Sequence, residues 1–322
     1  MIEALHDVRI PGGIQAQAVY HLWLILLAVC TVVFVGVMAA LALALRRAPR
    51  AGHDTPPAVE WLERSEPAIA RAVRIGVALS TVLLLGLLGA SVYTSWALAR
   101  LPLANALHIE LTAHQWWWEA RYDDPEPSRL FVGANELHIP VGRPVLLTLR
   151  ASDVIHSFWV PSLVGKKDLI PGRDATVMFR ADRSGVYRGQ CAEFCGYQHA
   201  KMALFVIADE PQSWQRWADR QRAPAPAPRT TQEARGRELF ERGTCAMCHA
   251  VDGTLAGGRQ APDLTHVASR MTLAAGALPN DAAARAAWIV DPQAFKPGAH
   301  MPATALSPQD AGAIAAFLES LQ

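Results

Sequence analysis

The chain contains two pairs of closely spaced cysteines, and a histidine accompanies each pair. The first pair lies in CAEFCGYQHAKM, residues 191–202, and the second in CAMCH, residues 245–249. Thiolate, thioether and imidazole groups are soft ligands that suit copper, zinc and haem iron. Because a 322-residue chain with five cysteines is not a disulfide scaffold, the two motifs predict metal or haem chemistry.

The second motif has the spacing of the attachment site for a c-type haem. The thiols of Cys245 and Cys248, one helical turn apart, would bond to the two vinyl groups, and the adjacent His249 would reach the iron. A redox dithiol and a zinc site are the alternatives. Zinc would need two more ligands nearby, and this part of the chain offers only His266 and His300. The motif therefore favours haem attachment.

A c-type haem usually has a second axial ligand, which is often a methionine. Met247 lies inside the attachment loop and cannot reach the opposite face of the haem. Met301 lies in KPGAHMPAT, an irregular loop with proline and glycine, and is the predicted ligand. The alternatives are Met271 in SRMTLAAG, which could equally pack in a core, and His300.

The first motif places two thiolates, one imidazole and one thioether within twelve residues, as Cys191, Cys195, His199 and Met202. His156, in DVIHSFWVP, is the candidate for a remote additional ligand. Two cysteines and two histidines would satisfy zinc. A thioether, however, is a poor ligand for zinc and a good one for copper, so the methionine favours copper. A disulfide between the two cysteines is the remaining alternative.

The segments that must position these groups begin with two apolar runs. No Asp, Glu, Lys or Arg occurs between Arg9 and Arg46, and a second uncharged run spans 75–99. Each exceeds the roughly 20 residues that cross a bilayer. A signal peptide is the alternative for the first run, which is longer than the usual apolar region of about 7–15 residues. Residues 1–104 are therefore predicted to be a tail and a two-helix transmembrane hairpin.

The placement of arginines predicts the orientation of the hairpin. Only Arg9 precedes the first run, whereas six arginines lie between the runs, namely Arg46, Arg47, Arg50, Arg64, Arg71 and Arg74. The positive-inside rule puts this connection in the cytoplasm, with both termini and the metal motifs on the periplasmic side of the bacterial inner membrane. The formal net charge of +1 argues against nucleic acid as a partner.

Three segments follow the hairpin. Residues 105–209 contain short alternating runs separated by glycine, proline and aspartate, which predicts an all-β sandwich or small barrel. Residues 210–232 are predicted to be an Ala/Pro-rich linker, in which alternating Ala-Pro from Ala223 to Pro228 favours an extended polyproline II spacer rather than a folded element. Residues 233–322 are alanine-rich with three helical patterns, one behind a Ser307 cap, and predict a small α-helical domain that a cofactor would stabilise.

The chain resembles subunit II of haem–copper cytochrome c oxidase over essentially its whole length. Two N-terminal helices, the motif C-x-E-x-C-G-x-x-H-x-x-M in an all-β domain, and a segment similar to class I cytochromes c follow the order of the caa type. The resemblance implies a cupredoxin-like domain with a dinuclear copper centre, CuA, and a domain with covalent haem c. The implied copper ligands are the bridging Cys191 and Cys195, the terminal His156 and His199, the weak ligand Met202, and the backbone carbonyl of Glu193.

The same resemblance gives roles to other residues. Pro262, in QAPDLT, would accept a hydrogen bond from the axial His249. Trp116, in HQWWW, matches the aromatic patch through which electrons reach CuA, although Trp117 stands where the family often has tyrosine. An aromatic cluster at the membrane interface is the alternative for this patch.

Two further features concern the neighbouring subunit. The side chain of Glu193 would help to bind a magnesium ion, and the loop SLVGKKDLIPGR would contact the catalytic subunit, with family positions at Lys167, Asp168, Pro171 and Gly172. No proton-path residue is assigned, because Glu60, Glu63 and Glu66 lie outside the usual context of the family.

The resemblance predicts a subunit of a respiratory, proton-translocating oxidoreductase. Electrons would arrive at haem c from a soluble or membrane-bound cytochrome c or another respiratory complex. They would pass to CuA and leave for catalytic subunit I, which works with other oxidase subunits and reduces oxygen to water.

Three other functions are alternatives to this one. A CuA-bearing subunit of a nitric oxide reductase is an alternative that the sequence leaves open. A membrane-anchored copper-binding or copper-delivery protein is another, and the fused haem segment argues against it. A quinol oxidase subunit is disfavoured because the copper ligands are intact.

Overall fold

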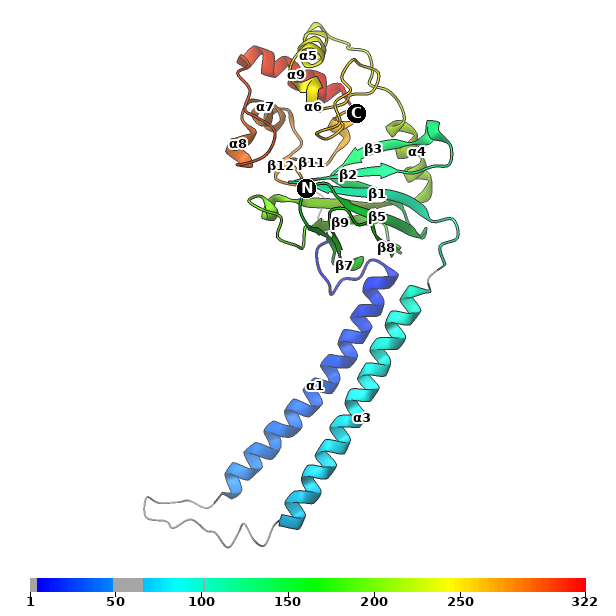
Figure 1. Ribbon diagram of the computed structural model, residues 1–322, viewed down its shortest axis with the longest axis vertical. Helices are drawn as coiled ribbons and strands as arrows, with labels where there is room; N and C mark the ends of the chain where they lie inside the picture. The colour runs from blue at the N-terminus through cyan, green and yellow to red at the C-terminus, as the bar shows by residue number, and fades with distance from the viewer. Residues whose placement is uncertain (1–4, 49–65, 101) are drawn as a thin grey trace, which may run out of the picture. The chain divides into compact units, whose positions relative to one another are not determined.

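A computed structural model describes residues 5–48, 66–100 and 102–322 and divides into two compact units. Ala18–Leu101 forms one unit, and Met1–Gln17 together with Pro102–Gln322 forms the other. Figure 1 shows the two long helices of the first unit and the sheets and short helices of the second. The predicted metal motifs both belong to the second unit.

The first unit contains most of α1 (Ile14–Arg47) and all of α3 (Glu66–Ala99), each of 34 residues. At about 1.5 Å per residue, each exceeds the roughly 30 Å hydrocarbon core of a bilayer. Their most apolar windows have mean hydropathies of 2.9 and 2.2, and their large apolar side chains are exposed. Both helices are thus long and apolar enough to cross a membrane, as predicted. Arg50, Arg64, Glu60 and Glu63 lie outside the described residues.

A β-sandwich follows the hairpin, which confirms the predicted all-β domain. One sheet has the order β3-β2-β1-β5-β8, a second has β4-β10-β9, and β6 pairs with β7. The strands are β1 (Leu107–His114), β2 (Trp117–Tyr122), β3 (Phe131–Ala134), β4 (Glu136–Pro140), β5 (Val145–Ala151), β6 (His156–Val160), β7 (Val164–Leu169), β8 (Ala175–Phe179), β9 (Gly185–Gln190) and β10 (Ala203–Asp209).

Alternation along the strands builds the core of the sandwich. In β1 the side chains of Leu107, Ile109, Leu111 and Ala113 are buried, and the intervening residues are more exposed. They join a single cluster of buried apolar residues from both larger sheets. The first cysteine motif lies in the segment that connects β9 to β10. Because these two strands pair antiparallel, both ends of the segment lie at the same end of the sheet.

Helix α4 (Pro211–Gln221) occupies the first half of the predicted linker 210–232, so the linker prediction is wrong there, whereas the residues predicted to be an extended spacer, Ala223–Pro228, contain no helix or strand. Trp214 and Ala218 belong to the core of the sandwich, and Trp217 stacks on His138 with ring centroids 4.1 Å apart. The helix forms because its apolar residues recur on one face and cover the sandwich. The following Ala-Pro residues have no regular structure, and Ala225 N donates to Asp252 O at 2.9 Å.

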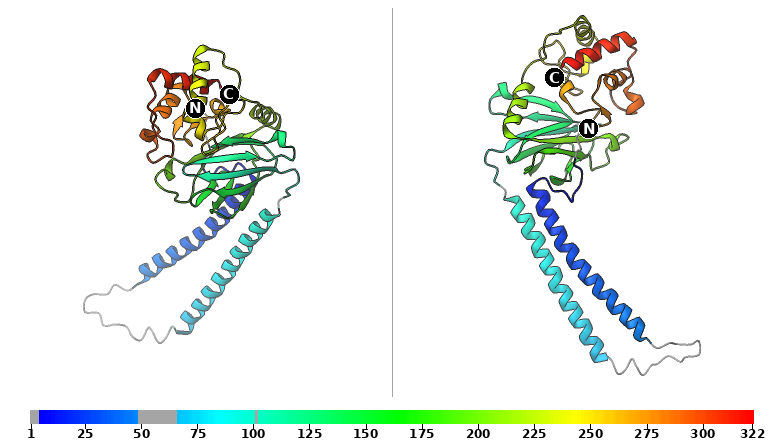
Figure 2. Two further views of the ribbon diagram at one scale, coloured as in Figure 1. Left: turned by 45° about the horizontal axis from the view of Figure 1, so that its top comes forward. Right: turned by 180° about the vertical axis from the view of Figure 1, so that it is seen from behind.

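The C-terminal domain is helical, as predicted. Its helices are α5 (Thr231–Arg242), α6 (Cys245–Cys248), α7 (Ala282–Val290), α8 (Pro292–Phe295) and α9 (Pro308–Ser320), with a small β-ladder of β11 (Thr272–Leu273) and β12 (Leu278–Pro279). The hydroxyl of Ser307 accepts a hydrogen bond from Asp310 N and caps α9 as expected. Helices α5 and α9 pack closely around Phe240 and Phe317. In the views of Figures 1 and 2 this domain lies against one end of the sandwich.

Candidate metal and haem sites

The predicted copper ligands converge at the end of the sandwich. The sulfurs of Cys191 and Cys195 lie 3.8 Å apart, and each faces a histidine. His156 Nδ1, from the first residue of β6, lies 3.8 Å from Cys191 Sγ, and His199 Nδ1 lies 3.5 Å from Cys195 Sγ. Met202 Sδ lies 3.8 Å from Cys195 Sγ. One loop and one remote strand therefore supply two thiols, two imidazoles and one thioether to a single place.

The carbonyl of Glu193 also points to this cluster, at 3.3 Å from Cys191 Sγ. His156, both cysteines and Met202 are buried, whereas His199 is half-buried. The structure thus brings together all six groups that the resemblance assigned to copper.

The two thiols are free and influence each other's ionisation. The hydrogen bond between the two sulfurs lowers the pKa of Cys191 and raises that of Cys195. Burial and repulsion by the charge of the Cys191 thiolate, 3.8 Å away, raise the pKa of Cys195 further. A cation between the sulfurs removes this repulsion. Two thiolates that share a metal at about 2.3 Å each can lie up to about 4.6 Å apart, so the observed separation fits a bridged metal centre. The disulfide alternative does not hold, since a disulfide requires about 2.05 Å.

A second layer of contacts orients the first histidine. Nε2 of His156 lies 2.8 Å from Asp153 Oδ1, which leaves Nδ1 directed at Cys191. The other carboxylate oxygen of Asp153 accepts a hydrogen bond from Gln115 N at 2.6 Å. A carboxylate in this position fixes the ring of a metal-bound histidine and its tautomer. Asp153 was not predicted from the sequence, although a carboxylate three residues before a candidate histidine ligand indicates a partner for that histidine.

The haem-attachment motif forms the single turn α6. Nδ1 of His249 lies 2.7 Å from the carbonyl oxygen of Pro262, which is the contact that the resemblance implied. Burial lowers the pKa of His249, so the ring is held neutral, as an iron ligand must be. Gly258 packs directly on the motif, because a Cβ there would lie 2.5 Å from the backbone carbon of Cys248.

The histidines that a zinc site would need are engaged elsewhere. The two ring nitrogens of His266 lie 2.8 Å from Gln322 O and 3.1 Å from Ala223 O. His300 lies beside Trp116, with ring centroids 6.4 Å apart. The local donor set therefore fits a haem better than zinc.

The loop of the predicted axial ligand Met301 is held by Gln293, another residue that the sequence analysis missed. The Gln293 amide donates to Ala299 O at 2.8 Å and to Met301 O at 2.7 Å, and it accepts from Gly298 N at 2.8 Å. Met271 contacts the sandwich instead, where its N–H donates to Glu136 Oε1 at 2.6 Å. The choice of Met301 over Met271 as iron ligand stays a prediction.

Trp116 contacts the copper-ligand loop and lies beside His300 of the C-terminal domain. It is 7% exposed, and its Nε1 donates to Cys195 O at 2.8 Å, within the copper-ligand loop. Gln115 Nε2 donates to the same oxygen at 2.7 Å. Trp118 is fully buried in the sandwich core, and Trp117 stacks on His114 at 4.2 Å. The alternative of a membrane-interface cluster therefore does not hold for Trp116 and Trp118.

The predicted subunit-contact loop forms the hairpin of β6 and β7. The four central residues of β7 are exposed, and Lys167 and Asp168 are among them. Gly172 has φ of 75°, which glycine adopts without strain, and it lies in a turn closed by a bridge between Ile170 and Arg173. The contact with a catalytic subunit stays a prediction.

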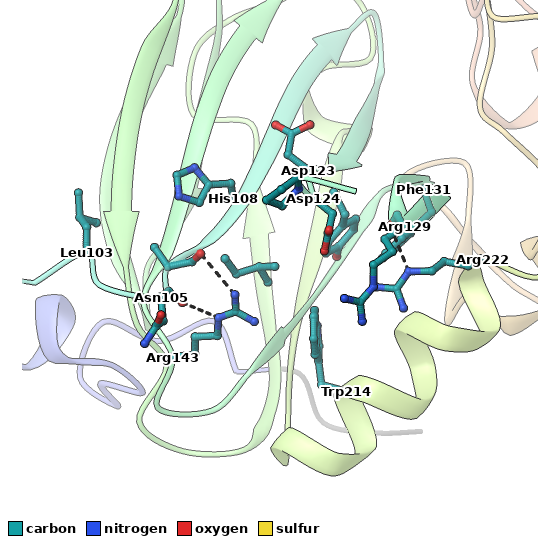
Figure 3. A pocket seen from close by; sticks show the side chains of 14 residues that line it. Leu103, Asn105, His108, Asp123, Asp124, Arg129, Phe131, Arg143, Trp214 and Arg222 are labelled. Carbon is teal, nitrogen blue, oxygen red and sulfur yellow. Dashed lines mark hydrogen bonds between the residues drawn. The ribbon is translucent and has the colours of Figure 1, made fainter. Parts of the chain in front are cut away.

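A pocket of about 570 Å³ lies apart from the predicted metal sites (Figure 3). Three arginines line it, and two of them bind backbone carbonyls. Arg143 Nε donates to Asn105 O at 2.7 Å, and Arg222 Nε donates to Arg129 O at 3.1 Å. No predicted copper or haem residue lines this pocket.

Fold and site together define a cupredoxin-like protein with a soft-ligand metal site, a haem-attachment domain and two apolar anchoring helices. Residues 125–209 match the family model "Cytochrome C oxidase subunit II, periplasmic domain", and residues 233–322 match the model "Cytochrome c". The chain belongs to the family of cytochrome c oxidase subunit II and carries a cytochrome c domain at its C-terminal end.

Named relatives support this membership. Cytochrome c oxidase subunit 2 of Alkalihalophilus pseudofirmus is 40% identical over 219 residues, which is 68% of this chain and 62% of that protein. The Bacillus subtilis protein of the same name is 32% identical, over 68% of this chain and 63% of its own. The chain thus spans a little under two thirds of these relatives. A solved periplasmic domain of subunit II of cytochrome oxidase from Bradyrhizobium japonicum is 30% identical, with a TM-score of 0.34, and covers 36% of this chain and 92% of its own.

Proposed function

We propose that this chain is the subunit through which electrons enter a respiratory cytochrome c oxidase. Electrons pass from haem c to CuA and then to a separate catalytic subunit that reduces oxygen to water with proton translocation. The observation that carries the proposal is the convergence of two thiols, two imidazoles, a thioether and a carbonyl at one place, joined in the same compact unit to a haem-attachment turn.

The copper ligands in this proposal are the bridging Cys191 and Cys195, the terminal His156 and His199, the weak ligand Met202 and the carbonyl of Glu193. A dinuclear copper centre with shared thiolates supplies one-electron transfer with little change in geometry. The protein contributes a buried set of ligands, with His156 oriented by Asp153, and the surrounding core excludes water.

In the second domain, Cys245 and Cys248 hold the haem covalently, and His249 and Met301 bind its iron. The Pro262 carbonyl fixes the ring of His249, and Gln293 fixes the loop of Met301. Trp116 links the domains for electron transfer, because it donates to the ligand loop at Cys195 O and lies beside His300 of the Met301 loop.

The proposed location is the bacterial inner membrane, with both termini and the two domains on the periplasmic side. The partners are catalytic subunit I, other oxidase subunits, and a soluble or membrane-bound cytochrome c or another respiratory complex as donor. A magnesium ion at the Glu193 side chain, shared with the catalytic subunit, is part of the same proposal.

The test is a copper and iron count on the purified full-length chain, with its electron paramagnetic resonance spectrum. We expect two coppers and one iron per chain, and hyperfine splitting from two equivalent coppers. One copper or none, with the haem intact, would refute the CuA assignment and favour a copper-binding or delivery protein. Oxygen or nitric oxide consumption by the complex purified with its partner decides between the oxidase and a nitric oxide reductase.

Matched methionine variants test the individual ligands. Met202→Leu should change the copper spectrum and leave the haem spectrum unchanged, whereas Met178→Leu, in β8 of the same sandwich, should change neither. Met301→Leu should abolish the spectral features of methionine-ligated haem, and Met271→Leu should retain them. The opposite outcome for the second pair would move the axial ligand to Met271.

A further inference from the structure

One loop of the haem domain, residues 295–300, covers the face of the sandwich that carries the copper ligands. We refer to it as the docking loop. Gln198 Nε2 donates to Pro297 O at 2.7 Å, and Lys201 Nζ donates to Phe295 O at 2.5 Å. Both donors come from the ligand-bearing segment between β9 and β10, so the loop rests directly on the copper-ligand loop.

A second set of contacts lies where β10 and β4 begin. Ala203 N donates to Ala275 O at 3.0 Å, and Met271 N donates to Glu136 Oε1 at 2.6 Å. Gly276, with φ of 82°, allows the close approach, because a Cβ there would lie 3.0 Å from Ala203 Cβ. Both sets of contacts restrain the haem domain on the sandwich.

Lys296 is the centre of the docking loop contact. Its side chain is 3% exposed, and Nζ donates to Trp116 O at 2.7 Å and to Ala274 O at 3.0 Å. One carbonyl belongs to the sandwich and the other to the haem domain, so a single ammonium group bridges the two. Burying an ammonium group is costly, and burial lowers the pKa of Lys296 to about 7, whereas the charge on Cys195 opposes this shift.

The position of Lys296 connects it to both sites. Trp116, whose carbonyl accepts from Lys296, donates through its indole to Cys195 O in the copper-ligand loop. Met301, the proposed iron ligand, lies five residues after Lys296 and directly after the docking loop. An interaction that fixes Lys296 on Trp116 therefore fixes the Met301 loop relative to the copper ligands.

Resting on the proposed function, we propose that Lys296 is a positioning residue that docks the haem domain on the copper domain and whose charge favours the reduced form of the copper centre. The docked haem domain covers Trp116, so a separate cytochrome c cannot reach this face. Electrons therefore arrive here from the haem of the same chain.

Hydrogen exchange on the full-length chain tests the docking directly. The amides of Ala203 and Met271 bond across the interface, so peptides that contain them report docking, whether or not the metals are bound. We expect protection in the wild type and at least about tenfold faster exchange in Lys296→Met, since a hydrogen bond from a charged group is worth that factor or more. Lys166→Met is the matched control, because its side chain is exposed in β7 and takes no part in the contacts described above. Exchange at core amides of β5 and α9 verifies that each variant is folded.

The copper reduction potential provides a second measurement. It would not change if Lys296 contributed only to folding. Removing a buried positive charge should shift the potential downwards in Lys296→Met at about pH 6, where a lysine with a pKa of about 7 is charged. Lys296→Arg, which retains charge and donors, should restore both potential and protection. Unprotected interface amides in the wild type, or equal protection in wild type and Lys296→Met, would overturn the proposal. A chain without copper or haem would refute the proposed function and leave the exchange test readable.

Discussion

Gly236 in α5 marks the closest approach between α5 and α9, and its replacement gives a sharp test of how the haem domain is held together. A Cβ at this position would lie 1.9 Å from Ala313 O and 2.9 Å from Phe317 Cβ. A backbone oxygen cannot rotate away as a flexible side chain can. Gly236→Ala therefore forces α5 away from α9, and the cluster around Phe240 and Phe317 loosens with it.

The magnitude follows from two opposing effects. Overpacking of a tight contact costs about 1–3 kcal/mol. Alanine in a helix is favoured over glycine by about 1 kcal/mol. Because the clash at Gly236 involves backbone atoms, the upper end of the first range applies and leaves a net loss of about 2 kcal/mol. For a domain of this size the corresponding fall in Tm is about 8–16 °C.

Gly312 in α9 is the matched control, because the nearest atom to a Cβ there is Gln232 Nε2 at 4.0 Å. Gly312→Ala has the same gain in helix propensity without the clash, so it should raise stability by up to about 1 kcal/mol. The assay is thermal unfolding of the full-length chain followed by circular dichroism in the haem absorption band, at equal haem content. A Gly236→Ala chain that melts at or above the wild-type temperature would refute the reasoning.

Three further substitutions test the copper site and the sandwich. Asp153→Asn removes the carboxylate that faces Nε2 of His156, and we expect copper affinity to fall by about 10–100-fold in a chelator competition. Burial by itself would lower the pKa of His138. Hydrogen bonds to Asp209 and Glu136 outweigh this effect and raise the pKa of His138. Asp209→Asn should therefore lower the unfolding free energy most at about pH 5–6, below the unfolded pKa of about 6.5, and the difference should shrink as pH rises through the raised folded pKa. Trp214→Phe removes the hydrogen bond from Nε1 to His138 O and should cost about 0.5–1.5 kcal/mol in chemical denaturation.

Each of these substitutions has an outcome that contradicts its argument. Unchanged copper affinity in Asp153→Asn would mean that Asp153 does not orient His156, and Asp174→Asn is the control with an exposed carboxylate in the same domain. A loss in Asp209→Asn that is equal at all pH values would exclude the ion pair with His138 as its cause. Full stability of Trp214→Phe would show that α4 is held by apolar contact alone.

The copper ligands that lie close together in the sequence could be predicted, because their residue types and their spacing both indicate a metal site. Cys191, Cys195, His199 and Met202 lie on one short segment, and the structure brings their donor atoms within 3.5–3.8 Å of a neighbour. Helix boundaries in the C-terminal domain were equally readable, since caps such as Ser307 act within one turn. His156, 35 residues before Cys191, was the one distant copper ligand predicted, although His108, His114 and His138 also lie in the β-domain.

The parts that were missed depend on packing between distant segments. The linker was predicted to begin at residue 210, but α4 forms in its first half because Trp214 and Trp217 pack on the sandwich. Lys296 lies in a polar loop that reads as exposed, and only the approach of Trp116, 180 residues earlier, buries it. No local pattern encodes such a contact.

The two polar groups of Trp116 explain why the copper and haem sites should respond together. Its indole N–H holds Cys195 O in the copper-ligand loop, and its backbone carbonyl holds the Lys296 ammonium from the haem domain. A shift of the haem domain therefore displaces the backbone of Trp116. The indole of the same residue, which donates to the copper-ligand loop, then moves with it. Substitutions in the docking loop should change copper spectra even though they contact no copper ligand. Substitutions on exposed faces of the haem domain should leave those spectra unchanged, because no comparable contact connects them to Cys195.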